Sequence, residues 1–213
     1  MSSDRPRLYV LAGVNGGGKS SIGGAVFRKR GADYFNPDEV ARKLRAERTS
    51  LTQREANGAA WQIGRALLER AIRDRLDFAF ETTLGGTTMT RLLEEAAECG
   101  IDVFVWYVGL ATAELHMERV AERVRRGGHP IPEEDIRRRW DRSRLDLVRL
   151  LPRLRELKVY DNTAEADPAA GKPPAPRLVL HVRDGRIVGP DELSSTPAWA
   201  KPIVAAALQR ART

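Results

Sequence analysis

The stretch Gly13-Val14-Asn15-Gly16-Gly17-Gly18-Lys19-Ser20 matches the phosphate-binding loop pattern G-x-x-x-x-G-K-[ST] at every fixed position. The apolar run at residues 8–12 in front of it is typical of a buried parallel strand, and residues 20–30 behind it carry apolar side chains at helical spacing. A strand, a glycine loop and a helix in this order turn backbone N–H groups and a helix N-terminus toward one phosphate group. A glycine-rich turn that binds nothing would not need the Lys-Ser ending. The stretch therefore predicts a nucleoside triphosphate site.

Each residue type in the loop has a separate role in binding a triphosphate and its metal ion. Lys19 would reach the outer phosphates as a point charge, and we expect it to be exposed, so that its removal leaves the fold intact. The Ser20 hydroxyl would hold Mg²⁺, which prefers oxygen ligands. The expected nucleotide-binding residues of the loop are Gly13, Asn15, Gly16, Gly17, Gly18, Lys19, Ser20 and Ser21.

The length and composition fit one globular domain, and we expect residues 1–213 to form a single unit. The chain is 42% hydrophobic and 31% charged, which is sufficient for a continuous core. One cysteine, Cys99, cannot build a disulfide framework, and residues 1–7 contain no signal-peptide core. No apolar run approaches the ~18 residues that a membrane span requires. We therefore expect a soluble, cytoplasmic protein with no membrane partner.

The net charge of +7 is concentrated in one segment. Residues 119–155 hold twelve Arg, no Lys and six acidic residues, which gives this segment a charge of +6. A cluster made of Arg alone favours bidentate binding of phosphate groups, although ion pairs on helix surfaces account for part of the count. No groove-reading motif accompanies the charge, so we expect no nucleic-acid partner.

Strand and helix patterns alternate along the chain. Strand patterns follow the loop at residues 32–35, 78–80, 101–110 and 158–161. The run at 101–110 is almost entirely β-branched or aromatic and predicts the central strand. Helix starts are predicted at Asn36, at the capping box that begins with Thr52, and at Pro132. We expect Trp61 and Ile63 to lie on the apolar face of the helix that Thr52 begins.

These patterns predict an α/β protein with a three-layer P-loop NTPase fold, in which helices cover both faces of a parallel sheet. A Pro- and Ala-rich linker at residues 166–176 precedes a predicted hairpin that turns at Asp184-Gly185. The hairpin and a short terminal helix form a tail at about residues 177–213. Ligands should gather at the carboxyl ends of the parallel strands.

Two acidic residues follow predicted strands at this ligand-binding edge. Asp38 is a candidate general base for an acceptor hydroxyl, and its alternative role is that of an ordinary carboxylate in the first turn of a helix. Glu81, with Thr82 and Thr83, could bind substrate hydroxyls, and Glu81 could also hold Mg²⁺ through water. The alternative role of Glu81 is to cap the following turn.

Arginines in the next segment have the spacing of a lid. Arg119, Arg123 and Arg126 form a stripe on the predicted helix at residues 112–126, and the hinge Gly127-Gly128-His129-Pro130-Ile131-Pro132 follows them. A lid at about residues 126–150 would close over the nucleotide and exclude water. The alternative is surface ion pairing, for example between Glu122 and Arg126. We expect His129 to be a loop residue and Trp140 to be a core residue.

Taken in order, the motifs resemble the zeta toxin family of P-loop kinases over roughly residues 8–163. They are Gly13 to Ser20, Asn36-Pro37-Asp38-Glu39, Phe80-Glu81-Thr82-Thr83, Arg119-Val120-x-x-Arg123-Val124, Gly127-Gly128-His129-x-Ile131-Pro132 and Tyr160-Asp161-Asn162. The Arg119-x-x-x-Arg123 pair also resembles nucleoside monophosphate kinases, in which the first arginine packs on adenine and the second meets phosphate. The sequence Asn-Pro-Asp differs from the acidic motif of the better-known toxins and fits a related chromosomal branch.

This resemblance implies an ATP- and Mg²⁺-dependent kinase that phosphorylates a sugar hydroxyl of a nucleotide sugar such as UDP-N-acetylglucosamine. It further implies that Asp38 is the catalytic base, that Lys19, Arg123 and Arg126 act on the transferred phosphate, and that Arg119 and Arg123 bind ATP. Asp38, Glu81, Thr82 and Thr83 would then bind the substrate. An antitoxin protein is an expected partner. The alternatives are a kinase of another small acceptor, such as a nucleotide or an antibiotic, and a nucleic-acid-binding P-loop ATPase.

Overall fold

The computed structural model describes residues 5–19, 22, 34–164 and 176–211. Its strands are β1 (Arg7–Ala12), β2 (Tyr34–Phe35), β3 (Phe78–Thr82), β4 (Asp102–Gly109), β5 (Glu156–Asp161), β6 (Arg177–Arg183) and β7 (Arg186–Gly189). Its helices are α2 (Pro37–Glu47), α3 (Gln53–Arg73), α4 (Thr87–Glu98), α5 (Ala113–Arg125), α6 (Glu133–Leu150) and α7 (Lys201–Arg210), with short 3-10 helices η2 (Leu151–Arg153) and η3 (Ala198–Ala200). Most of the helix predicted at 20–30 and of the linker predicted at 166–176 lies outside the described residues.

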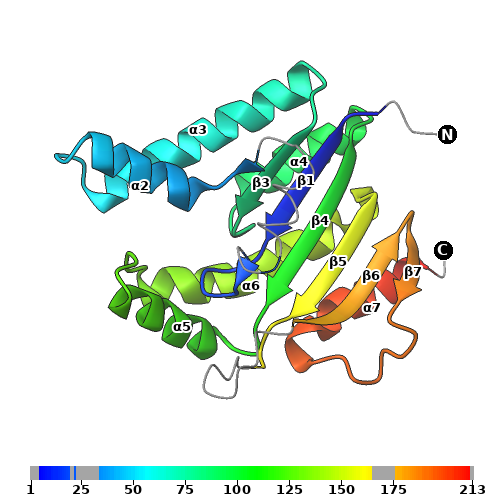
Figure 1. The fold of residues 1–213 in the computed structure, drawn as a ribbon. Helices are drawn as coiled ribbons and strands as arrows, with labels where there is room; N and C mark the ends of the chain where they lie inside the picture. The colour runs from blue at the N-terminus through cyan, green and yellow to red at the C-terminus, as the bar shows by residue number, and fades with distance from the viewer. Residues whose placement is uncertain (1–4, 20–21, 23–33, 165–175, 212–213) are drawn as a thin grey trace.

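The strands form one sheet in the order β2-β3-β1-β4-β5-β6-β7 (Figure 1). The strands from β2 to β5 pair in parallel, and β6 and β7 add an antiparallel hairpin. The sheet is thus mostly parallel with helices on both sides, which confirms the predicted P-loop kinase-like fold. Because β1 lies between β3 and β4, the carboxyl ends of these three strands meet at one edge, where open α/β sheets bind ligands.

The main core lies on one face of this sheet. β4 is the central strand, as predicted, and its Val103, Val105 and Tyr107 side chains are at most 1% exposed. Helices α3, α4, α6 and α7 pack residues such as Leu68 and Leu147 against this face. Full burial of one large apolar side chain contributes about 1.5–3 kcal/mol, so this face supplies the rigid support for the edge of the sheet.

Local sequence signals explain where several elements begin and turn. The Asn36 side chain caps α2 by accepting hydrogen bonds from the backbone N–H groups of Asp38 and Glu39. Thr52 and Glu55 form the predicted capping box at the start of α3. The β6–β7 turn uses Asp184 and Gly185, whose φ angles of 53° and 75° suit the predicted hairpin turn. These predictions are therefore confirmed.

Two tryptophans differ in how well the sequence placed them. Trp140 packs at the edge of the core, as expected, and the Arg144 guanidinium lies 3.5 Å from the centre of its ring. Trp61 and Ile63 were expected on the apolar face of α3, but they are 38% and 39% exposed, so this prediction was wrong. Residues of α3 such as Leu68 fill the core, because the N-terminal half of α3 extends past the sheet beside α2 (Figure 1).

No helix in the described part of the chain has the length and apolar character to cross a membrane.

Candidate active site

The phosphate loop takes a backbone path that only glycine permits at its key positions. Gly13 has a φ of 136°, and a Cβ atom there would lie 2.1 Å from the Val108 carbonyl oxygen on β4. Gly18 has a φ of 85°, and a Cβ atom there would lie 2.4 Å from Asn162 Nδ2 at the end of β5. The loop therefore packs closely against the ends of β4 and β5, and larger residues at Gly13 and Gly18 would clash there.

Lys19 is the last described residue of the loop, and it forms a buried ion pair. Its Nζ lies 3.5 Å from Glu81 Oε1 at the end of β3, and the two side chains are 7% and 9% exposed. The expectation of an exposed Lys19 was therefore wrong, because the loop turns the side chain back toward β3. Ser20 and Ser21 lie outside the described residues, so their predicted contacts with Mg²⁺ and the nucleotide stay predictions.

Glu81 collects donors from several elements at once. The Tyr34 hydroxyl donates to Glu81 Oε2 over 2.8 Å, and Asn36 Nδ2 donates to the same oxygen over 3.2 Å. With Lys19 on its other oxygen, this carboxylate joins the phosphate loop to the ends of β2 and β3. Asn36 contributes twice, since its Oδ1 also caps α2 and thereby fixes the position of Asp38 in the first turn.

Asp38 projects from this first turn toward two basic side chains. Arg123 Nη1 lies 3.6 Å from Asp38 Oδ2, and His129 Nε2 lies 4.0 Å from Asp38 Oδ1. Arg123 Nη2 also donates to the His129 carbonyl oxygen over 3.1 Å. The Asp38 side chain keeps 45% of its surface exposed. The carboxylate is therefore positioned by charge and remains accessible to a ligand.

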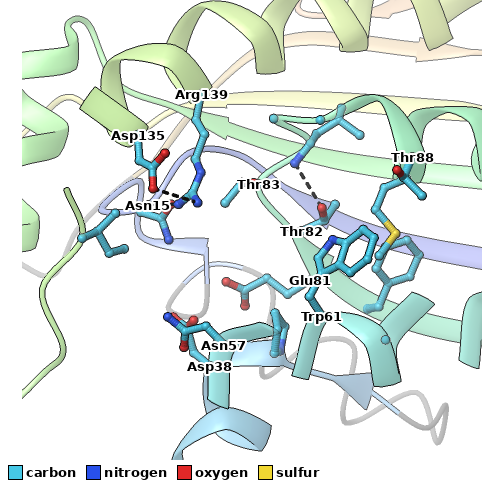
Figure 2. Close-up of a pocket in the computed structure, with 18 of the residues that line it drawn as sticks. Asn15, Asp38, Asn57, Trp61, Glu81, Thr82, Thr83, Thr88, Asp135 and Arg139 are labelled. Carbon is cyan, nitrogen blue, oxygen red and sulfur yellow. Dashed lines mark hydrogen bonds and ion pairs between the residues drawn. The ribbon is translucent and has the colours of Figure 1, made fainter. Parts of the chain in front are cut away.

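Asp38 and Glu81 face a common cavity of about 330 Å³ (Figure 2). Phe35, Trp61, Phe80 and Met89 provide its apolar wall, and Asn57, Thr82, Thr83 and Thr88 provide neutral polar groups. Asn15 of the phosphate loop lines one end, and His129, Asp135, Arg138 and Arg139 line it from the hinge and α6. The structure thus brings the predicted substrate residues Asp38, Glu81, Thr82 and Thr83 together beside the loop. A cavity of this size and mixed lining suits a small polar ligand.

Arg139 of α6 reaches the phosphate loop, and the sequence analysis did not single it out. Its Nη1 donates to Asn15 Oδ1 over 2.9 Å, and its Nη2 lies 3.6 Å from Asp135 (Figure 2). A Cβ atom at Gly85 would lie 2.8 Å from Arg139 Cγ, so the glycine after β3 makes room for this side chain. Burial lowers the pKa of Arg139, and the nearby Asp135 opposes that shift. The run Arg137-Arg138-Arg139 in the sequence indicates that an arginine could reach the loop, but it does not indicate which of the three does so.

Two of the arginines that were predicted to form a lid, Arg119 and Arg126, make other contacts. Arg119 Nη2 donates to the Thr163 carbonyl oxygen over 3.3 Å, beside the end of β5. Arg126 is at the C-terminal end of α5 with 76% of its side chain exposed, and its Nε lies 2.9 Å from Glu122 Oε1. Arg126 does not line the cavity, and in this conformation it makes the ion pair that was the alternative interpretation.

A buried histidine of α5 forms a hydrogen bond with the backbone of the phosphate loop, and the sequence analysis missed it. His116 of α5 is 1% exposed, and its Nδ1 lies 2.8 Å from the Asn15 carbonyl oxygen. A carbonyl oxygen only accepts, so Nδ1 carries the hydrogen. Burial lowers the pKa of His116 to about 4, and the charges of Lys19, Arg119 and Arg144 add to this, so the ring is neutral near pH 7. The helical spacing of α5 placed His116 near buried positions, but no local signal tied it to the loop.

The fold and this site define a P-loop nucleotide-binding domain. A family model described as an AAA domain matches residues 8–145, which is more than half of the chain. The chain therefore belongs to this AAA domain family. It is 30% identical to an uncharacterized protein of Haemophilus influenzae over 144 residues, which are 64% of this chain and 99% of that protein.

Solved structures share the fold at low sequence identity. A chain of the AvrRxo1-ORF1:AvrRxo1-ORF2 complex with ATP matches with a TM-score of 0.65 and 16% identity, over 95% of this chain and 64% of that one. A chain of the PezAT chromosomal toxin-antitoxin system of Streptococcus pneumoniae matches with a TM-score of 0.58 and 14% identity, over 99% and 87%. A putative kinase of Chloroflexus aurantiacus matches with a TM-score of 0.51 and 13% identity, over 64% and 77%. At these identities the likeness shows the fold alone.

Proposed function

We propose that the protein is an ATP-dependent kinase that transfers the γ-phosphoryl group to an alcohol group of a small molecule in the cavity. One observation carries this proposal: Asp38 and Glu81, the ion-pair partner of Lys19, face the same cavity, and Asn15 of the phosphate loop lines one end of it. An acceptor bound there has a carboxylate on one side and the triphosphate cradle on the other, as phosphoryl transfer requires.

Each group then has a chemical role. Asp38 orients the acceptor hydroxyl and takes its proton, while Lys19, Arg123 and the lid arginines, including Arg126, offset the charge on the transferring group. Arg119 and Arg123 bind the nucleotide, and Glu81, Thr82 and Thr83 bind the acceptor. Mg²⁺ would neutralise the phosphate oxygens. The candidate ligands suit Mg²⁺, because Ser20 and the buried Glu81 carboxylate offer only oxygen atoms.

We propose a nucleotide sugar such as UDP-N-acetylglucosamine as the acceptor. The support is the resemblance to zeta toxins, together with a cavity that combines an aromatic wall with many groups able to bind sugar hydroxyls. A kinase of another small acceptor, such as a nucleotide or an antibiotic, is the second candidate, because the same cavity fits other small polar molecules of similar size.

We also propose a protein partner of the antitoxin type. Two of the solved structures with this fold come from two-component assemblies, the AvrRxo1-ORF1:AvrRxo1-ORF2 complex and the PezAT toxin-antitoxin system. Copurification of the tagged protein with the product of an adjacent reading frame in its native host tests this proposal.

The experiment that tests the kinase function uses the purified protein with Mg-ATP. UDP-N-acetylglucosamine, nucleoside monophosphates and a metabolite extract are each incubated with it, and mass spectrometry follows the gain of one phosphoryl group. We expect the nucleotide sugar to gain the group on its sugar ring, as mapped by NMR. If only a nucleoside monophosphate gains it, the second candidate is correct. If no compound in the extract gains it, the kinase proposal fails.

A further inference from the structure

The hinge between α5 and α6 is built to hold one imidazole against Asp38. Gly127 has a φ of 90°, which favours glycine, and a Cβ atom at Gly128 would lie 2.9 Å from the Arg123 carbonyl oxygen. These two glycines let the chain fold tightly over the end of α5. The next residue, His129, then lines the cavity with 19% of its side chain exposed.

Arg123 fixes the relative positions of His129 and Asp38. It binds the His129 carbonyl oxygen through Nη2 at 3.1 Å and approaches Asp38 Oδ2 through Nη1 at 3.6 Å. The guanidinium therefore occupies one carboxylate oxygen and leaves Oδ1 to face the imidazole. The 4.0 Å between Asp38 Oδ1 and His129 Nε2 is longer than a hydrogen bond, so no hydrogen is shared in this state.

The surroundings of His129 keep its ring uncharged near pH 7. Burial is the largest cause that lowers its pKa below the ordinary 6.5, and the positive charges of Arg123 on α5 and Arg45 on α2 lower it further. Asp38 on α2 acts in the opposite direction and raises the pKa. In the tautomer that carries its hydrogen on Nδ1, the Nε2 atom that faces Asp38 can accept a proton once that carboxylate has acquired one.

We propose that His129 is the proton-relay partner of Asp38: it removes from Asp38 the proton that the acceptor hydroxyl gives up and passes this proton to solvent. This inference rests on the proposed kinase function. The acceptor oxygen forms a bond to the γ-phosphorus as the bond to the β,γ-bridging oxygen breaks, and ADP leaves with that electron pair. The acceptor proton moves to Asp38 Oδ1, then to His129 Nε2, and then to water, so one proton is released per turnover.

The relay explains a feature that positioning alone does not. An Asp38 carboxyl group that has taken the acceptor proton must lose it before the next turnover. An imidazole has a higher proton affinity than a carboxylate, and the partly exposed His129 ring connects Asp38 to solvent. His129 therefore acts through Asp38, as a positioning residue that resets the base.

The kinetic test compares His129→Ala with His129→Gln in the full-length protein. We expect kcat to fall about 10²-fold in both, the low end of the effect of acid–base groups, with little change in the affinity for ATP. Added imidazole should restore the Ala variant to within about tenfold of wild type and should not raise the low turnover of Asp38→Asn. The decrease of kcat at low pH, which lies below pH 6.5 in the wild type, should be absent in His129→Gln.

His181→Gln is the matched control, since His181 pairs with Glu156 away from the cavity, and it should behave as wild type. Normal kcat in both His129 variants, or loss without rescue and with an unchanged pH profile, would overturn the relay.

A second measurement does not depend on turnover. NMR titration of the labelled His129 ring should give a pKa below 6.5 in the wild type and a still lower one in Asp38→Asn, because the attraction of the carboxylate is gone. An unchanged His129 pKa in Asp38→Asn would overturn the relay even if the protein is a kinase. A coupled pair in a protein that phosphorylates nothing would instead overturn the proposed function.

Discussion

Arg139 of α6 donates a 2.9 Å hydrogen bond to the side chain of Asn15, which lies 124 residues earlier in the phosphate loop. The same Asn15 accepts a hydrogen bond from the buried ring of His116 through its backbone carbonyl oxygen. Asn15 of the phosphate loop thus connects α6 to α5. Since a phosphate bound by the loop would approach Asn15, the guanidinium of Arg139 is already within reach of it.

We predict that Arg139→Ala slows turnover by roughly 10²-fold, because charge clamps on a transferring phosphoryl group contribute several kcal/mol. Arg139→Lys should recover only part of the rate, since an ammonium cannot bind two oxygens as a planar fork. Arg123→Ala should cause a similar loss.

Arg126→Ala tests whether the segment that carries Arg126 moves. Arg126 reaches a nucleotide only after a conformational change, and normal turnover in this variant would remove Arg126 from the site. Steady-state kinetics with melting temperatures separate these effects from loss of folding.

The buried Lys19–Glu81 pair gives a prediction about both activity and stability. Lys19→Ala should abolish turnover and also lower stability by roughly 2 kcal/mol, because the buried Glu81 carboxylate loses the cation beside it. The double variant Lys19→Met/Glu81→Gln removes both charges and should melt close to wild type while remaining inactive. Thermal unfolding of the three proteins checks this. A Lys19→Ala protein with full turnover would remove the role assigned to the loop.

The parts of the site that follow local rules could be predicted from the sequence. The phosphate loop depends on glycines at fixed spacing, and the position of Asp38 depends on the Asn36 cap two residues before it. Parallel strands then bring the ends of β1 and β3 together, which places Glu81 beside Lys19. Each step needs only neighbouring residues or the general geometry of a parallel sheet.

The parts that depend on long-range packing could not be predicted. Whether Arg137, Arg138 or Arg139 faces the loop is decided by how α6 crosses the glycine after β3. His129 reads as an ordinary loop residue until the hinge folds back against α2. Trp61 has the apolar character of a core residue, and only the relation between α3 and the sheet shows that it lines a cavity.

Trp61 provides a test of the acceptor site. We predict that Trp61→Ala raises the KM for the acceptor about tenfold, equivalent to about 1.4 kcal/mol, with ATP affinity unchanged. The physical reason is that an exposed indole on the cavity wall gives a flat apolar surface for a ring of the acceptor. Ile63→Ala is the matched control, because Ile63 is equally exposed on the same helix and does not line the cavity. Equal effects of the two substitutions would show that the cavity wall does not bind the acceptor.

The base assignment makes a prediction that separates binding from transfer. Asp38→Asn keeps the shape of the side chain and loses its basicity, so Mg-ATP should bind almost normally while kcat falls by a factor on the order of 10²–10⁴. Calorimetry measures the affinity, and product formation measures the rate. Unchanged turnover in this variant would refute the role of Asp38 and, with it, the need for a relay through His129.

The last prediction concerns the dependence of folding on pH through His116. Its pKa of about 4 in the folded protein lies below the unfolded value of about 6.5, so between these values the unfolded chain binds the proton and the folded chain does not. Stability is therefore complete above pH 6.5 and falls as the pH is lowered toward 4, by about 2–3 kcal/mol from this group.

His116→Asn isolates this contribution, because its amide can still donate to the Asn15 carbonyl oxygen but does not titrate. Urea unfolding of both proteins between pH 7 and pH 4.5 gives two sets of free energies of unfolding. In their difference, the contribution of the carboxylates that both proteins share cancels. We expect the wild type to lose about 2–3 kcal/mol more than the variant over this range, and parallel curves would mean that the ring is not held neutral beneath the loop.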